Sequence, residues 1–167
     1  MTTTPPVKRR LTSMVYEAIL LFGLVVITAL LFAVAVEQRH ALYMRHGLQA
    51  VLMAAISIYF IWFWTHGGQT LPMKTWRMRV VTTDGQPLGL KRALARYVLA
   101  WFWFLPGLAV AWALDVDGWA MVLIPAANIV LWALTAYFDP QRQFLHDRIA
   151  GTRIVGVEPQ PEKTAAI

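Results

Sequence analysis

The sequence predicts an all-α polytopic membrane protein with four transmembrane helices, short amphipathic helices and a small β element. Hydrophobic residues make up 58% of its 167 residues and charged residues only 14%, whereas soluble domains contain roughly 45–50% and about 25%. Four apolar runs approach the length of about 20 residues that a helix needs to cross the hydrocarbon core. They cover residues 14–36, 47–65, 97–114 and 119–138. This composition excludes an ordinary water-soluble globule.

Positive charge is distributed unevenly among the segments that flank these runs. All but two of the 15 Lys and Arg residues precede the first run, follow the second or follow the fourth, and only Arg39 and Arg45 lie elsewhere. The positive-inside rule therefore places both termini and the central segment in the cytoplasm. We assign the net charge of +6 to orientation and to contact with anionic lipids of the bilayer, and expect no nucleic-acid partner.

The chain is expected to form one domain over residues 1–158, with disordered polar ends at residues 1–6 and 159–167. The first run resembles a secretory signal, but it is longer than the roughly 7–15 residues of such a segment and contains Glu17. We therefore predict a retained helix. The short loops at residues 37–46 and 115–118 predict two pairs of antiparallel neighbouring helices.

The central segment, residues 66–96, has room for structure outside the membrane. Its side chains alternate near residues 76–83, before the turn dipeptide Asp84-Gly85, which is typical of a strand. An exposed strand needs a partner, and residues 152–157 provide the other strand-like stretch. We predict that the two pair as a small cytoplasmic sheet.

Two short amphipathic helices are predicted beside this sheet. From residue 88 the pattern places Lys91, Arg92 and Arg96 on a basic side, so this helix should lie in the interface before bending into the third span. Near the C-terminus, Asp139 suits an N-cap, Pro140 the first helical position and Gly151 the stop signal.

Glu17 is the one carboxylate inside an apolar run, and such a residue is a candidate functional site with a partner. Arg10 lies about two helical turns earlier and shares its face. Three alternatives remain open. Glu17 lies in the first turn of a helix capped by Ser13, where the helix dipole favours it; it forms a structural ion pair; or it is an ion or proton site.

Asp147 is the other carboxylate outside the loops and tails. On the cytoplasmic face it could pair with Arg10, Lys74 or Arg79, which would make it a latch between the terminal motif and the rest of the protein. Two kinks, at Pro106 and Pro125, either set packing or mark a transport path.

The sequence predicts neither catalysis nor a bound cofactor. It has no cysteine, and its four histidines lack companion ligands at helical spacing. His66 and His146 are expected at the cytoplasmic edge, bonded to headgroups or carbonyls. No catalytic serine, phosphate-loop or zinc-protease motif occurs. We therefore expect no metal, no cofactor and no enzyme activity.

Three segments, "GQTLPMKTWRMRVVTTDG", "KRALAR" and "RQFLHDRIAGTRIV", together with an Arg followed seven positions later by an acid, resemble the RDD family of bacterial membrane proteins. The resemblance covers roughly residues 10–157 and implies a functional charged triad of Arg10, Glu17 and Asp147. A supporting cytoplasmic motif would comprise Gly68, Thr70, Lys74, Arg79, Asp84, Gly85, Arg96, Arg142, His146, Gly151 and Thr152. Two positions depart from the family pattern: Glu17 replaces an Asp, and Pro72 replaces a Gly.

The resemblance implies an inner-membrane protein and suggests transport of a small ion or solute, of the cation/proton exchange type. Four helices barely enclose a path, so transport would require a homo-oligomer or a partner membrane subunit. Glu17 would respond to protons or cations, with Arg10 as its counter-charge and Asp147 as gate or latch. The alternative is a non-transporting scaffold or assembly module in which the charged triad is structural.

Overall fold

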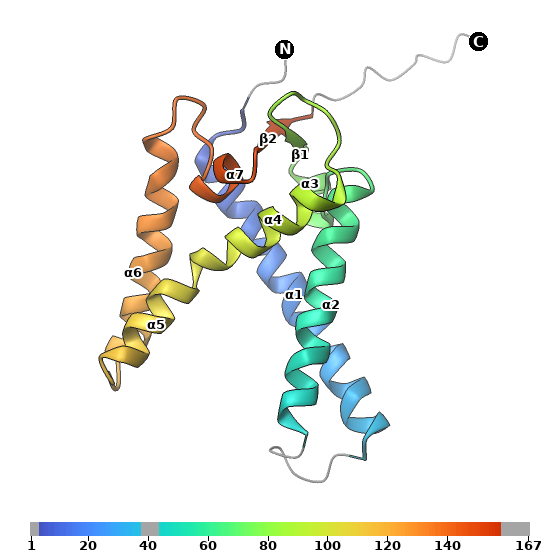
Figure 1. Cartoon of the computed structure of the whole chain (residues 1–167), viewed down its shortest axis with the longest axis vertical. Helices are drawn as coiled ribbons and strands as arrows, with labels where there is room; N and C mark the ends of the chain where they lie inside the picture. Colours follow the sequence, from blue (N-terminus) through green and yellow to red (C-terminus); the bar gives the residue numbers. More distant parts are fainter. Residues whose placement is uncertain (1–3, 38–43, 158–167) are drawn as a thin grey trace, which may run out of the picture.

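The computed structural model describes residues 4–37 and 44–157, so the predicted disorder of residues 159–167 lies outside the described residues. The described chain is mostly helical, with a small two-stranded sheet (Figure 1). In order, its elements are α1 (Val7–Ala35), α2 (Arg45–Thr65), α3 (Leu71–Thr75), β1 (Met78–Thr82), α4 (Leu90–Ala100), η1 (Trp101–Trp103), α5 (Leu105–Ala113), α6 (Ala120–Leu134), η2 (Thr135–Tyr137), α7 (Leu145–Ile149) and β2 (Thr152–Gly156).

Among the described residues, three helices are long and apolar enough to cross a membrane, and a fourth span arises if a bent pair is counted as one. The three are α1, α2 and the stretch Ala120–Tyr137. The bent pair joins Leu90–Trp103 to Leu105–Ala113 at 40°. Phe104 has non-helical dihedrals there and precedes Pro106, which has no backbone N–H to donate. The predicted third span, residues 97–114, is therefore broken and not continuous.

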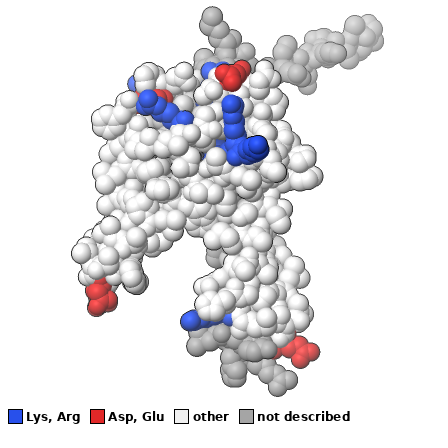
Figure 2. Space-filling model, in the orientation of Figure 1, with Lys and Arg blue, Asp and Glu red and all other residues white. Residues whose placement is uncertain are grey.

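The helices form two legs that project from a common end (Figure 1). α1 and α2 form one leg, α5 and α6 form the other, and α4 runs between the two. The sheet, α3, α7 and the start of α1 lie together at the common end. On the face in Figure 2, charged side chains gather at that end and at the tips of the legs, and none shows on the legs between them. Many large apolar side chains of the helices are exposed. This distribution suits legs surrounded by lipid.

The small sheet confirms the predicted pairing of the central and C-terminal segments. β1 and β2 are antiparallel, with Val80 opposite Ile154. The outer edge of β1 is covered by the end of the α2–α3 connection, because Val80 N–H donates to the Gly68 carbonyl at 2.7 Å and the Gln69 amide donates to the Met78 carbonyl at 2.7 Å. Covering the edge removes a site for pairing with other chains.

The predicted helix starting at Asp139 begins later than expected. Asp139 Oδ2 accepts the backbone N–H groups of Gln141 at 3.1 Å and Gln143 at 2.9 Å, which forms a turn in place of a helix cap. Arg142 has a φ of +53°, which the right-handed helix does not allow. α7 therefore starts at Leu145, and Gly151, with a φ of +64°, follows its C-terminus as predicted.

Two apolar clusters hold the common end together. The larger lies between the sheet and α2, α3 and α4, and the smaller joins the start of α1 to η1, η2 and the segment before α7. Their buried members are Trp64, Met73, Met78, Val80, Leu88, Ala93, Tyr97 and Ile154 in the first cluster, and Val7, Trp103, Ala136 and Phe144 in the second. β2 is thus packed against the central segment, and the start of α1 is packed against η1, η2 and the segment before α7.

Gly68→Ala should destabilise the fold. Gly68 has a φ of +71°, and a Cβ there would lie 2.4 Å from the Val80 carbonyl oxygen, so the edge contact of β1 must break. We expect a loss of about 2–4 kcal/mol in the free energy of unfolding, measured by thermal unfolding in detergent. Gly89→Ala is the control, because no atom lies within 4 Å of its added Cβ. Equal losses in the two variants would contradict this role of Gly68.

Candidate functional site

The candidate site begins with a polar stripe on α1. The buried residues of this helix are Val7, Arg10, Ser13 and Glu17, which recur every three or four positions and so share one face. Many of the large apolar residues further along α1 are exposed. The helix is thus polar where protein covers it and apolar where lipid would surround it, as expected of a membrane protein whose polar groups line its interior.

Glu17 is bonded by two neutral hydroxyl groups. The Tyr59 hydroxyl donates to Oε1 at 2.5 Å and the Thr70 hydroxyl donates to Oε2. Among the described residues, no basic side chain lies within ion-pair distance of this carboxylate. The structural ion pair is therefore wrong for the described residues, and Arg10 donates to the Arg142 carbonyl instead. The Ser13 cap is also wrong, because α1 already begins at Val7 and Glu17 lies beyond its first turn.

Arg10 points to the opposite wall of the site. Its side chain is 1% exposed, its guanidinium lies 4.4 Å from the centre of the Phe144 ring, and it donates to the Arg142 carbonyl. Arg142 therefore contributes through its backbone, while its side chain is exposed. Nε and Nη1 of Arg10 have no hydrogen-bond partner among the described residues.

Asp147 forms a buried ion pair with Arg96. Arg96 Nε donates to Asp147 Oδ1 at 2.8 Å, and the two side chains are 7% and 0% exposed. The Thr152 hydroxyl donates to the Asp147 carbonyl at 3.1 Å, and the Arg96 guanidinium lies 4.3 Å from the Trp64 ring centre. The expected partners Arg10, Lys74 and Arg79 were wrong, because α4 packs against α7 and turns Arg96 inward rather than to the basic surface.

His146 lies beside this ion pair in a buried aromatic environment. Its Nδ1 accepts the indole N–H groups of Trp103 at 3.2 Å and Trp132 at 3.3 Å, so the expected bonding to headgroups or carbonyls is wrong. Burial lowers the pKa of His146 to about 4; Asp147 opposes this shift, and Arg96 and Arg10 add to it. The imidazole is therefore neutral at neutral pH.

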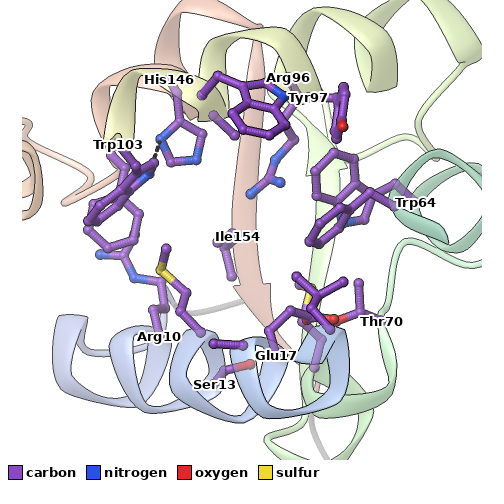
Figure 3. Close-up of a pocket in the computed structure, with 18 of the residues that line it drawn as sticks. Arg10, Ser13, Glu17, Trp64, Thr70, Arg96, Tyr97, Trp103, His146 and Ile154 are labelled. Carbon is purple, nitrogen blue, oxygen red and sulfur yellow. Dashed lines mark hydrogen bonds between the residues drawn. The ribbon is translucent and has the colours of Figure 1, made fainter. Parts of the chain in front are cut away.

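These side chains surround a cavity of about 290 Å³ between α1, α2, α4, α7 and β2. Figure 3 shows Arg10, Trp103 and His146 on one side, Glu17, Thr70 and Trp64 on the other, and Ile154 behind. Arg96 enters from α4. The site thus brings Arg10, Glu17, Arg96 and His146 to one cavity, whereas Asp147 lies behind Arg96 and is absent from the lining.

The remaining residues of the predicted motif do not line the cavity. Gly68 and Gly151 shape the backbone, and Thr152 supports Asp147. Lys74, Arg79, Asp84 and Gly85 are exposed. Sequence reasoning missed Tyr59, Trp64, Trp103 and Trp132, since an aromatic residue in an apolar run looks the same whether it faces lipid or a polar partner.

Asp147→Asn should lower the free energy of unfolding by about 3–5 kcal/mol, because it leaves Arg96 as an unpaired buried charge. Thermal unfolding in detergent measures the loss, and Asp84→Asn in the exposed turn is the matched control. The double variant Arg96→Met/Asp147→Leu should recover most of the stability. An unchanged melting temperature for Asp147→Asn would contradict a structural ion pair.

The stability of the protein should fall as the pH falls from about 6.5 towards about 4. The unfolded chain takes up a proton at His146 near its ordinary pKa of 6.5, whereas the folded protein resists this until about pH 4. The contribution is therefore present above pH 6.5 and lost on acidification, with an upper size of about 3 kcal/mol. His146→Gln should reduce the pH dependence of the free energy of unfolding, and the exposed control His66→Gln should not. Equal stability–pH profiles for the two variants would contradict this role of His146.

Comparison with known proteins supports the membrane character that the apolar helices indicate. The model of the RDD family matches residues 4–151, which is most of the chain. Searches of curated proteins and of solved structures gave no match. The match includes Arg10, Glu17 and Asp147, the segment before β1 and the start of the C-terminal motif. This chain therefore belongs to the RDD family, a family of membrane proteins.

Proposed function

We propose that this protein moves a small ion or solute across the bacterial inner membrane, with Glu17 as the carboxylate that responds to protons or cations. The observation that carries the proposal is the environment of Glu17. It lies on a membrane-spanning helix, is 9% exposed, lines the cavity and meets two neutral hydroxyls. The proposed activity is non-enzymatic and uses no cofactor.

A carboxylate without a cation partner is costly to bury, and it persists in membrane proteins where a function needs it. Among the described residues, no group of three or more His, Asp or Glu could hold a metal ion. A single carboxylate with two hydroxyls therefore suits a proton or a monovalent cation better than a divalent one. This favours proton-coupled or cation-coupled movement.

Asp147 differs from Glu17 because its charge is matched by Arg96 and supported by Thr152. We assign it the role of a latch that joins α7 to α4. The residues of the charged triad thus have separate tasks, with Glu17 in exchange and Asp147 in structure. Arg10 faces the same cavity as Glu17 without pairing with it.

In the proposed arrangement both termini and the common end with the sheet face the cytoplasm. The distribution of Lys and Arg supports this orientation by the positive-inside rule. The two legs diverge, so one copy does not enclose a path by itself (Figure 1). We therefore propose that transport uses a homo-oligomer or a partner membrane subunit.

A second candidate function is a non-transporting scaffold or assembly module. The observation that favours it is the buried Arg96–Asp147 pair, which holds the C-terminal motif against α4 and whose carboxylate lies outside the cavity lining. In that case Glu17 would also be structural. Its replacement would then lower the amount of folded protein and leave no transport to lose.

Proton and sodium flux in proteoliposomes tests the proposal. Glu17→Gln should abolish flux at matched amounts of reconstituted protein, because the amide cannot exchange a proton. Tyr59→Phe should shift its pH dependence, since it removes one hydrogen bond to the carboxylate. Glu37→Gln is the control, because Glu37 is exposed at the far end of α1.

The result should differ for the latch residue. Asp147→Asn is expected to reduce the yield of folded protein, while the flux per folded molecule is retained. A well-folded wild-type protein without proton or sodium flux would exclude these two ions. Full flux from Glu17→Gln would remove Glu17 from the mechanism.

A further inference from the structure

Two buried side chains that line the cavity carry N–H groups without an acceptor among the described residues. Nε and Nη1 of Arg10 and Nε1 of Trp64 have no hydrogen-bond partner among the described residues, and the two side chains are 1% and 3% exposed. Both line the cavity. Buried N–H groups in native proteins are almost always bonded. Unbonded donors at the wall of a cavity therefore point to an acceptor that occupies it.

The charges of the other cavity residues leave Arg10 as the main site for an anion. Arg96 is already paired with Asp147, and the Glu17 carboxylate is bonded by Tyr59 and Thr70. In the described part of the chain, Arg10 has only a carbonyl acceptor and the face of an aromatic ring. A guanidinium presents its N–H groups as a planar fork, which matches the oxygens of a phosphate or carboxylate.

The cavity changes from polar to apolar along α1. Its lining on this helix runs from Arg10 to Leu21, a rise of about 16 Å at 1.5 Å per residue. Leu21, Ile56 and Phe104 contribute apolar side chains to the lining. Met14 and Phe104, which are 38% and 46% exposed, also belong to the lining, so the lining includes residues at the surface of the protein.

We infer that this cavity binds an anionic amphiphile, with the oxyanion headgroup at Arg10 and Trp64 and the acyl chain against Leu21, Ile56 and Phe104. A volume of about 290 Å³ is near the lower end of ligand pockets, roughly 300–1,000 Å³. It accommodates a headgroup and the first part of a chain. The rest of the chain would lie along the apolar legs.

The anionic amphiphile would be the solute of the proposed function, and the claim that it is transported rests on that function. Glu17 lines the same cavity as Arg10, so an anion enters more easily when Glu17 is protonated. Movement of the amphiphile would then be coupled to a proton. Binding alone is measured without flux, and the two claims can fail separately.

Equilibrium binding to the full chain in neutral detergent tests the site. The probes are phosphatidylglycerol, myristate and zwitterionic phosphatidylcholine, with bound molecules counted by native mass spectrometry. Wild type should prefer the two anionic probes to phosphatidylcholine. Arg10→Gln should weaken anionic binding by at least about tenfold, because charged hydrogen bonds are lost. Lys8→Gln is the control, since it removes the same charge from an exposed position of α1 two residues away.

A second variant tests the site without touching a charge. Ala18 lines the cavity, so Ala18→Phe should fill it, retain the folded state and reduce binding of both anionic probes. Inorganic phosphate should compete only weakly, since it lacks a chain. Equal binding of anionic and zwitterionic lipids, equal effects of Arg10→Gln and Lys8→Gln, or strong binding of phosphate alone would overturn the inference. Intact lipid binding without ion flux would instead count against the proposed transport.

Discussion

The ion pair between Arg96 and Asp147 is the constraint on which the common end of the protein depends. Both side chains are almost fully removed from solvent, and they join α4 of the central segment to α7 near the C-terminus. The Thr152 hydroxyl bonds to Asp147 at the first residue of β2, whose partner is β1. One contact therefore ties together helix packing, sheet pairing and the position of the C-terminal motif. Because an unpaired charge is so costly in the interior, these elements must dock together.

The surrounding membrane explains how a chain with few charged residues can bury polar side chains. The legs can expose large apolar side chains because lipid replaces water around them, so their buried faces need not be apolar. α1 uses this freedom, since its buried stripe carries Arg10, Ser13 and Glu17. Aromatic rings from the surrounding elements supply much of the remaining wall. Trp103 in this wall and Trp132 outside it donate indole N–H groups to His146. A polar site is thus enclosed within a chain of low charge.

Several features of the site were predictable from residue patterns alone. Arg10 and Glu17 do share a face of α1, because their spacing of seven residues is about two helical turns. The strand pairing was also predictable, since alternation indicated the first strand and residues 152–157 were the other strand-like stretch on that side. The partners of the charges were not. Arg96 was predicted on the basic side of its helix, and no pattern singled out Tyr59, because local pattern carries no information about which distant helix lies opposite.

The sequence by itself determined the class of the protein, its candidate spans and the segments that form the sheet, because these follow from composition and from local periodicity. Tertiary structure decided which charges meet. In the folded protein the third span is broken at Phe104, α7 starts at Leu145 and Asp147 pairs with Arg96. It also left Glu17 with two hydroxyls and Arg10 with unbonded N–H groups at a cavity. The physical reason is that the energy of a buried charge is set by neighbours far away in the chain, whereas the fold class is set by neighbours within a few turns.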